Sequence, residues 1–212
     1  MAIKPILFNT EMVRAILDGR KCCTRRIVKH DVEAILNSPY HKEHPEVEDK
    51  QIIRKLCMPP YQPGDILYVR ETWHKYTKRV GEGENCHLAE FYGYKASVAN
   101  SEEANEPWKP SIHMPKEAAR IWLKVTDVRV ERLQEIDEDG AVKEGIYVAS
   151  CKDCNAPFGC DTCPDEGYNE IDEFAELWDY TIKKSDLDRY GWDANPWVWV
   201  IEFERCEKPE GV

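Results

Sequence analysis

A lysine and a threonine, three residues apart, lie in the most basic stretch of an acidic chain. Lys21 and Thr24 fall within residues 18–28, which also contain three arginines. An amine beside a hydroxyl can act on a carbonyl or a phosphate, because the amine serves as a base or as a source of positive charge. The alternative is an ordinary basic turn exposed to solvent, because short motifs often occur by chance.

A short helix, a turn and a strand are expected to position these two side chains. Asn9 or Thr10 can cap the helix, and Gly19 suits the left-handed residue that ends it. Residues 24–28 combine β-branched side chains with two arginines and predict a strand. The lysine then lies on the turn and the threonine at the start of the strand, so we expect both to face one cavity.

The same stretch resembles the signature of the ASCH domain, a family of the PUA-like superfamily. The signature G-x-K-x-x-T-x-R is matched by Gly19, Lys21, Thr24 and Arg26. The turn and strand at residues 63–69 resemble the family's next landmark, and residues 197–203 resemble its closing strand. Within the family, the chain is similar to phage and prophage proteins. The resemblance implies a PUA-like β-barrel that recognises RNA or a modified nucleobase or nucleoside.

One small bacterial member of this family is an amidohydrolase that removes the acetyl group from N4-acetylcytidine with a lysine, a threonine and a glutamate. The resemblance implies that Thr24 is the nucleophile, Lys21 the base or charge stabiliser, and Glu144 a proton carrier. The alternative for Glu144 is a solvated side chain in the last turn of a short helix. The first hypothesis is therefore recognition of RNA or a modified nucleobase, and the second is hydrolysis of an acylated nucleoside.

A carboxylate and an indole follow the strand expected at residues 66–70. Glu71 can read the edge of a base and Trp73 can stack on its face, so both join Gly19 and Arg26 in the expected ligand site. The alternative is an ordinary barrel rim with Trp73 as a lid on the core.

Four of the nine cysteines form the most specific chemical motif of the chain, C-x2-C-x5-C-x2-C. They are Cys151, Cys154, Cys160 and Cys163. Four thiolates can close a tetrahedral shell around a structural Zn²⁺ ion. An iron–sulfur cluster and unligated thiols are the alternatives. The N-terminus does not resemble a signal peptide, so the cysteines indicate a reducing, cytoplasmic compartment.

The charge and hydropathy of the chain limit its partners. The net charge of −11 argues against a general coat for duplex DNA, because phosphate-driven binding needs clustered cations. A small nucleoside is compatible with this charge. No apolar run approaches the roughly 18 residues of a membrane span, so we expect no membrane partner. A phage accessory protein that works through protein contacts is a third hypothesis, and the oligomeric state is not indicated.

We expect one mixed α/β domain over residues 1–206 and a tail at 207–212: a PUA-like β-barrel with flanking helices. A helical insertion is expected at about residues 30–60, with its helices broken by Pro39 and Pro45, and a zinc-pinned loop at about residues 150–165. Outside the insertion, periodicity predicts strands at 66–70, 87–96, 120–133 and 197–204, and helices at 137–144 and 172–183.

Overall fold

The protein is a mixed α+β molecule with a mostly sheet core and several helices. The computed structural model describes residues 1–97, 107–146 and 170–211. Contacts divide the chain into two compact units, and each unit is discontinuous in sequence. Unit 1 comprises residues 1–19, 64–124 and 204–212, and unit 2 comprises residues 20–63 and 125–203.

Strand pairing in the described residues gives one five-stranded sheet and one two-stranded ribbon. The strands are β1 (Ile3–Leu7), β2 (Cys23–Ile27), β3 (Ile66–Arg70), β4 (Trp73–Val80), β5 (His87–Tyr94), β6 (Trp122–Arg132) and β7 (Trp197–Cys206). The sheet has the order β1-β3-β6-β7-β2, and the ribbon is β4-β5. Strands β6 and β7 each run from one unit into the other. The pairing is an open series, so the closed barrel that the resemblance implies stays a prediction.

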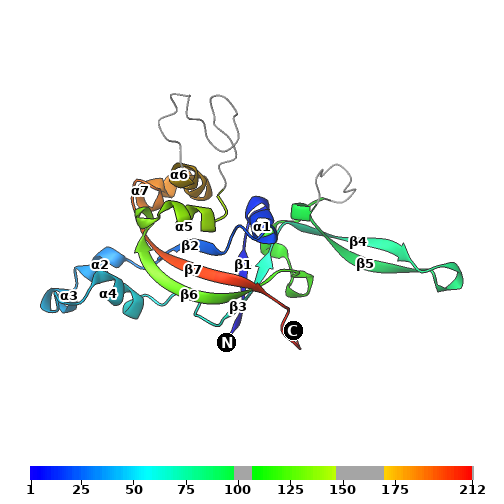
Figure 1. Cartoon of the computed structure of the whole chain (residues 1–212), viewed down its shortest axis with the longest axis horizontal. Coiled ribbons are helices and arrows are strands. Elements are labelled where there is room, and N and C mark those ends of the chain that lie inside the picture. Colours follow the sequence, from blue (N-terminus) through cyan, green and yellow to red (C-terminus); the bar gives the residue numbers. More distant parts are fainter. Residues whose placement is uncertain (98–106, 147–169, 212) are drawn as a thin grey trace, which may run out of the picture. The chain divides into compact units, whose positions relative to one another are not determined.

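Unit 1 contains the helix and the turn that precede the basic stretch. Helix α1 (Thr10–Leu17) begins after Asn9, whose side chain accepts a hydrogen bond from the Met12 N–H, so the expected cap is confirmed. Gly19 has φ +77°, the left-handed conformation that favours glycine at a helix end. In the same unit, β1 pairs with β3 in parallel and β3 pairs antiparallel with the first residues of β6 (Figure 1).

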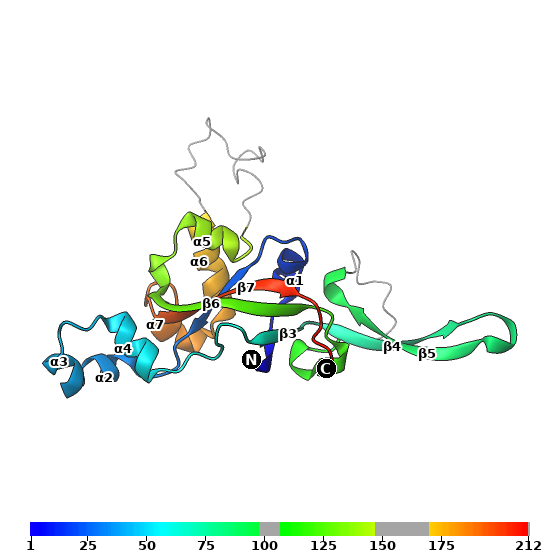
Figure 2. The ribbon, with the colours of Figure 1, turned by 60° about the horizontal axis from the view of Figure 1, so that its bottom comes forward.

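The ribbon of β4 and β5 also belongs to unit 1 (Figure 2). Its register pairs Trp73 with Tyr94 and Val80 with His87. The sequence predicted β5 but not β4, because the segment HKYTKR that fills most of β4 has no alternation of apolar and polar residues. Cross-strand contacts between aromatic side chains, such as Tyr76 stacked on Phe91 at 5.7 Å, hold the ribbon together instead.

Unit 2 packs helices on the sheet face formed by β2 and β7. These strands pair antiparallel, with Thr24 opposite Ile201. The helices of the unit are α2 (Val32–Leu36), α3 (Pro39–Glu43), α4 (Asp49–Leu56), α5 (Glu138–Lys143), α6 (Glu170–Thr181) and α7 (Leu187–Tyr190). Helices α5 and α6 lie side by side in Figures 1 and 2. Their apolar residues share one core with Cys23, Val198 and Val200.

The helical insertion has one difference from the prediction. Helix α2 ends at Leu36, so the helical pattern is broken before Pro39, and Pro39 then begins an additional short helix, α3. A proline at the first position of a helix removes no hydrogen bond, because the first N–H groups of a helix have no partner within it. The insertion therefore contains three short helices, α2, α3 and α4, in place of the two that were expected.

Among the described residues, none of the helices has the length and apolar character needed to cross a membrane.

Candidate functional site

The short segment before β2 is bound to the C-terminal end of α5. The Cys22 N–H donates to the Lys143 carbonyl at 3.0 Å, and the Arg20 guanidinium donates to the Gly145 carbonyl at 2.9 Å. The Lys21 ammonium donates to the Glu144 carbonyl at 2.8 Å. The last carbonyls of a helix have no partner within it and carry partial negative charge. Residues 20–22 therefore cap the C-terminal end of α5. These hydrogen bonds fix the position of Lys21 in unit 2.

Lys21 and Glu144 form the centre of the candidate site. The Lys21 Nζ atom lies 2.6 Å from Glu144 Oε2, and the two side chains are 0% and 4% exposed. The structure thus brings together two of the three residues to which the resemblance assigns catalytic roles. Two charges so thoroughly buried are costly unless they are paired and hydrogen-bonded. Both conditions are met here, because the ammonium also donates to a backbone carbonyl.

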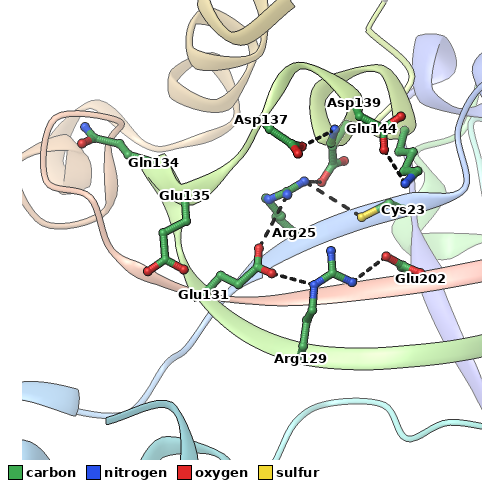
Figure 3. A network of polar contacts seen from close by, with 12 residues as sticks. Cys23, Arg25, Arg129, Glu131, Gln134, Glu135, Asp137, Asp139, Glu144 and Glu202 are labelled. Carbon is green, nitrogen blue, oxygen red and sulfur yellow. Dashed lines mark hydrogen bonds and ion pairs between the residues drawn. The ribbon is translucent and has the colours of Figure 1, made fainter. Parts of the chain in front are cut away.

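A second cation reaches the same carboxylate. Arg25 Nη1 lies 3.3 Å from Glu144 Oε1, and Arg25 Nη2 lies 3.8 Å from Glu131 Oε2 (Figure 3). The guanidinium lies over the Phe174 ring at 5.7 Å. A Cβ atom at Gly140 would be 3.1 Å from Arg25 Nη2. Glycine at this position of α5 therefore allows the arginine to approach the helix closely.

The charges continue from Glu131 along the sheet. Arg129 lies between two carboxylates, with Nε 2.6 Å from Glu131 Oε1 and Nη1 2.5 Å from Glu202 Oε1 (Figure 3). Burial lowers the pKa of Arg129, but hydrogen bonds to these two carboxylates raise it more, so the net shift is upward. Arg129 therefore stays charged, and the set of Lys21, Arg25, Arg129 and three glutamates is a continuous ionic network.

Cys23 lies against this network but is not poised to react. Burial raises the pKa of the Cys23 thiol to about 12; the Glu144 carboxylate adds to the rise, and Arg25 opposes it. The thiolate is the nucleophilic form of cysteine, and almost none of it forms near neutral pH at such a pKa. Cys23 contributes instead to the apolar core under α5 and α6.

Thr24 and Arg26 lie on the other face of β2, because successive side chains of a strand alternate between faces. Thr24 is buried. Among the described residues, no hydrogen bond joins its hydroxyl to Lys21 or Glu144, so the structure does not join Thr24 to the pair. Burial lowers the pKa of Arg26, and the nearby Tyr61 and Glu144 partly offset this decrease.

Glu71 and Trp73, the other two expected ligand-binding residues, belong to unit 1. Glu71 is buried and accepts two hydrogen bonds of 2.9 Å from Arg120, through Nε and Nη2. Trp73 is buried in a core that includes Met114 and lies against the ring of Tyr92 at 5.8 Å. These contacts support the alternative reading of Trp73 as a lid on the core.

Sequence reasoning placed Arg25 near Lys21 but missed its carboxylate partners, and it missed Arg129, Glu131 and Glu202. Side chains alternate between the two faces of a strand, so Arg25 lies on the same face of β2 as Cys23, the face that α5 covers. This alternation is the local sequence pattern that could have assigned Arg25 to the site. The partners of Arg25 lie 106 or more positions away along the chain, at Glu131 and Glu144. No local pattern predicts which carboxylate such an arginine meets.

The four cysteines expected to bind zinc, Cys151, Cys154, Cys160 and Cys163, lie outside the described residues. Within the part of the chain that is described, no group of three or more histidine, cysteine, aspartate or glutamate side chains is arranged to hold a metal ion.

Comparison of the chain with protein-family models, with curated proteins and with solved structures found no match.

Proposed function

We propose that the chain is an ASCH-domain protein of the PUA-like superfamily. Its proposed ligand is RNA that carries a modified base, or a free modified nucleoside. The ligand site is proposed around Lys21, Thr24 and Arg26. The observation that carries the proposal is the buried contact between Lys21 and Glu144, because the resemblance assigns function to both residues. The local geometry also supports it, since the glycine of the signature is left-handed and the threonine is the second residue of strand β2.

The chemistry of the pair suits a nucleobase. Lys21 donates hydrogen bonds and Glu144 accepts them, and a base edge offers acceptors and donors in return. In the free protein the two side chains satisfy each other. A base that inserts beside them must replace those bonds, so a ligand with a matching carbonyl and amino group is favoured over one without them. The acidic chain as a whole, at −11, favours a small ligand over a long polyanion.

Hydrolysis of an N-acylated nucleoside is the second candidate function, favoured by the 2.6 Å distance between Lys21 Nζ and Glu144 Oε2. Protons transfer readily across such a contact. Glu144 would take a proton from Lys21, and the neutral amine would take the proton of the Thr24 hydroxyl as its oxygen attacks the amide carbonyl. The re-formed ammonium would stabilise the oxyanion. Glu144 would then protonate the departing amine, and water would release the acyl group from Thr24. This route requires the Thr24 hydroxyl to come within hydrogen-bond reach of Lys21 when the ligand binds.

One experiment separates the candidates. The purified chain is incubated with N4-acetylcytidine, cytidine and acetate are followed by chromatography, and equilibrium dialysis measures bound nucleoside in parallel. Release of both products indicates the hydrolase, whereas saturable binding without products indicates recognition. If neither occurs, and RNA oligomers show no salt-dependent binding, both proposals fail and the protein-contact hypothesis takes their place.

We also propose a structural Zn²⁺ ion on Cys151, Cys154, Cys160 and Cys163, supported by the spacing of the two C-x2-C pairs. Metal analysis of the purified chain is expected to find about one zinc ion per chain. The double variant Cys151→Ser, Cys154→Ser is expected to lose it. The matched variant Cys86→Ser changes an exposed cysteine of unit 1 and is expected to keep the metal. Iron in place of zinc, or no metal, would contradict the proposal.

A further inference from the structure

Unit 2 contains a pocket at the far end of β2 from Lys21. Its volume is about 190 Å³. Its walls come from the residues after β2, the end of β6, helix α7 and the start of β7. The apolar part of the lining is formed by Val28, Val32, Ala194 and Pro196. A pocket with an apolar wall and a few polar groups is the usual form of a small-molecule site.

Two arginines line this pocket, and each lies over an aromatic ring. The Arg132 guanidinium is 4.5 Å from the centre of the Trp197 ring, and that of Arg189 is 5.1 Å from the centre of the Tyr190 ring. The Arg132 Nη1 atom donates to the Asn195 carbonyl at 3.0 Å. Among the described residues, neither arginine takes part in an ion pair. The cation–π contact holds each guanidinium beside its ring and leaves N–H groups for a ligand.

Trp197 forms part of the pocket wall. Its side chain is nine-tenths buried, and its ring lies beneath the Arg132 guanidinium. Its indole N–H is itself buried and has no hydrogen-bond partner among the described residues. The indole resonance of Trp197 therefore reports on a ligand that binds beside Arg132.

Asp31 and Glu33 limit the charge of the ligand. Both line the pocket and both are exposed, and Asp31 also accepts a hydrogen bond from the Ala34 N–H as the cap of α2. Two carboxylates beside two guanidinium groups leave little net positive charge, and His30, which also lines the pocket, adds at most one more. A ligand with one negative charge therefore fits the pocket better than a dianion, which the carboxylates would repel.

We propose that this pocket binds a small monoanion with a short apolar body, of the class of aromatic or branched-chain carboxylates. Arg132 and Arg189 hold the carboxylate, and the apolar wall, together with the Trp197 ring, contacts the body. This site is separate from the proposed nucleoside site, and neither proposal depends on the other.

The test uses benzoate as the probe and the full chain labelled with ¹⁵N. The indole resonance of Trp197 is assigned by its loss in Trp197→Phe. We expect it to shift in a saturable way as benzoate replaces chloride at constant ionic strength, with a dissociation constant on the order of 1 mM. Arg132→Gln and Arg189→Gln are each expected to weaken binding about tenfold, the loss that corresponds to one charge-assisted hydrogen bond. Inorganic phosphate, largely a dianion at pH 8, is expected to bind more weakly than benzoate.

Arg79→Gln is the matched control, because Arg79 is exposed and belongs to unit 1. It is expected to bind benzoate as the unmodified chain does. The exposed Arg189 can be replaced without disturbing the core, so at least one arginine variant keeps its fold. An indole resonance that does not move, or one that moves equally in the unmodified chain and in Arg189→Gln, would overturn the proposal.

Discussion

Replacing Glu144 by glutamine is expected to lower the free energy of unfolding by about 3–5 kcal/mol. The carboxylate is the common partner of Lys21 at 2.6 Å and of Arg25 at 3.3 Å, and all three side chains are buried. Glutamine keeps the shape of the residue but removes its charge. Two neighbouring buried cations then lose the negative charge that they share, and Arg25 keeps Glu131 at 3.8 Å. Urea unfolding followed by circular dichroism measures the loss.

Two comparisons make this prediction specific. Lys21→Met should cost less than Glu144→Gln, because the carboxylate keeps Arg25 as its partner when the lysine is removed. Glu90→Gln breaks a solvated ion pair with Lys75 and should leave the urea midpoint unchanged, because exposed pairs contribute little. A loss below about 1 kcal/mol in Glu144→Gln, the size expected of a surface pair, would show that the network does not stabilise unit 2.

The second large effect is expected on function. Lys21→Met should lower the affinity for N4-acetylcytidine about 100-fold, or kcat/KM by about 10²–10³ if the chain is a hydrolase. The ammonium is the group placed to donate to the ligand carbonyl or to stabilise its oxyanion. Methionine retains much of the length and apolar volume of lysine but has no such donor. Isothermal titration measures the affinity, and cytidine release measures the turnover.

Lys183→Met is the control for this experiment, because Lys183 is an exposed lysine of the same unit. It should leave affinity and turnover unchanged. Thr24→Val separates the two candidate functions. It should abolish turnover if Thr24 is the nucleophile, and it should change binding much less if the site only recognises the base. An equal response of Lys21→Met and Lys183→Met would remove Lys21 from the site.

The sequence predicted the elements whose signals are local. The Asn9 cap, the left-handed Gly19 and strand β3 each depend on residues within a few positions of one another, and the structure has all three. The strand expected at residues 24–28 is observed one position earlier, as β2 at Cys23–Ile27. Capping and turn preferences are properties of short segments, so they can be recognised without knowledge of the fold.

The parts that sequence reasoning missed depend on distant contacts. Strand β4 is polar along most of its length and forms because β5 pairs with it. Arg25 becomes part of the site because Glu131 and Glu144 come to it from later parts of the chain. Glu144 itself was predicted only through the family resemblance, since a glutamate at the end of a six-residue helix has no distinctive local pattern. Periodicity indicates which face a side chain occupies but not which partner it meets there.

The most direct measurement is the ¹⁵N resonance of the Lys21 ammonium during a titration with N4-acetylcytidine. The group is buried and donates to two oxygens of Glu144, so its protons exchange slowly enough to be observed. Its signal is assigned by its absence in Lys21→Met. We predict a saturable shift that follows the binding curve from calorimetry. A Lys21 signal that stays in place while the nucleoside binds would show that the ligand site is elsewhere and would contradict the proposed function.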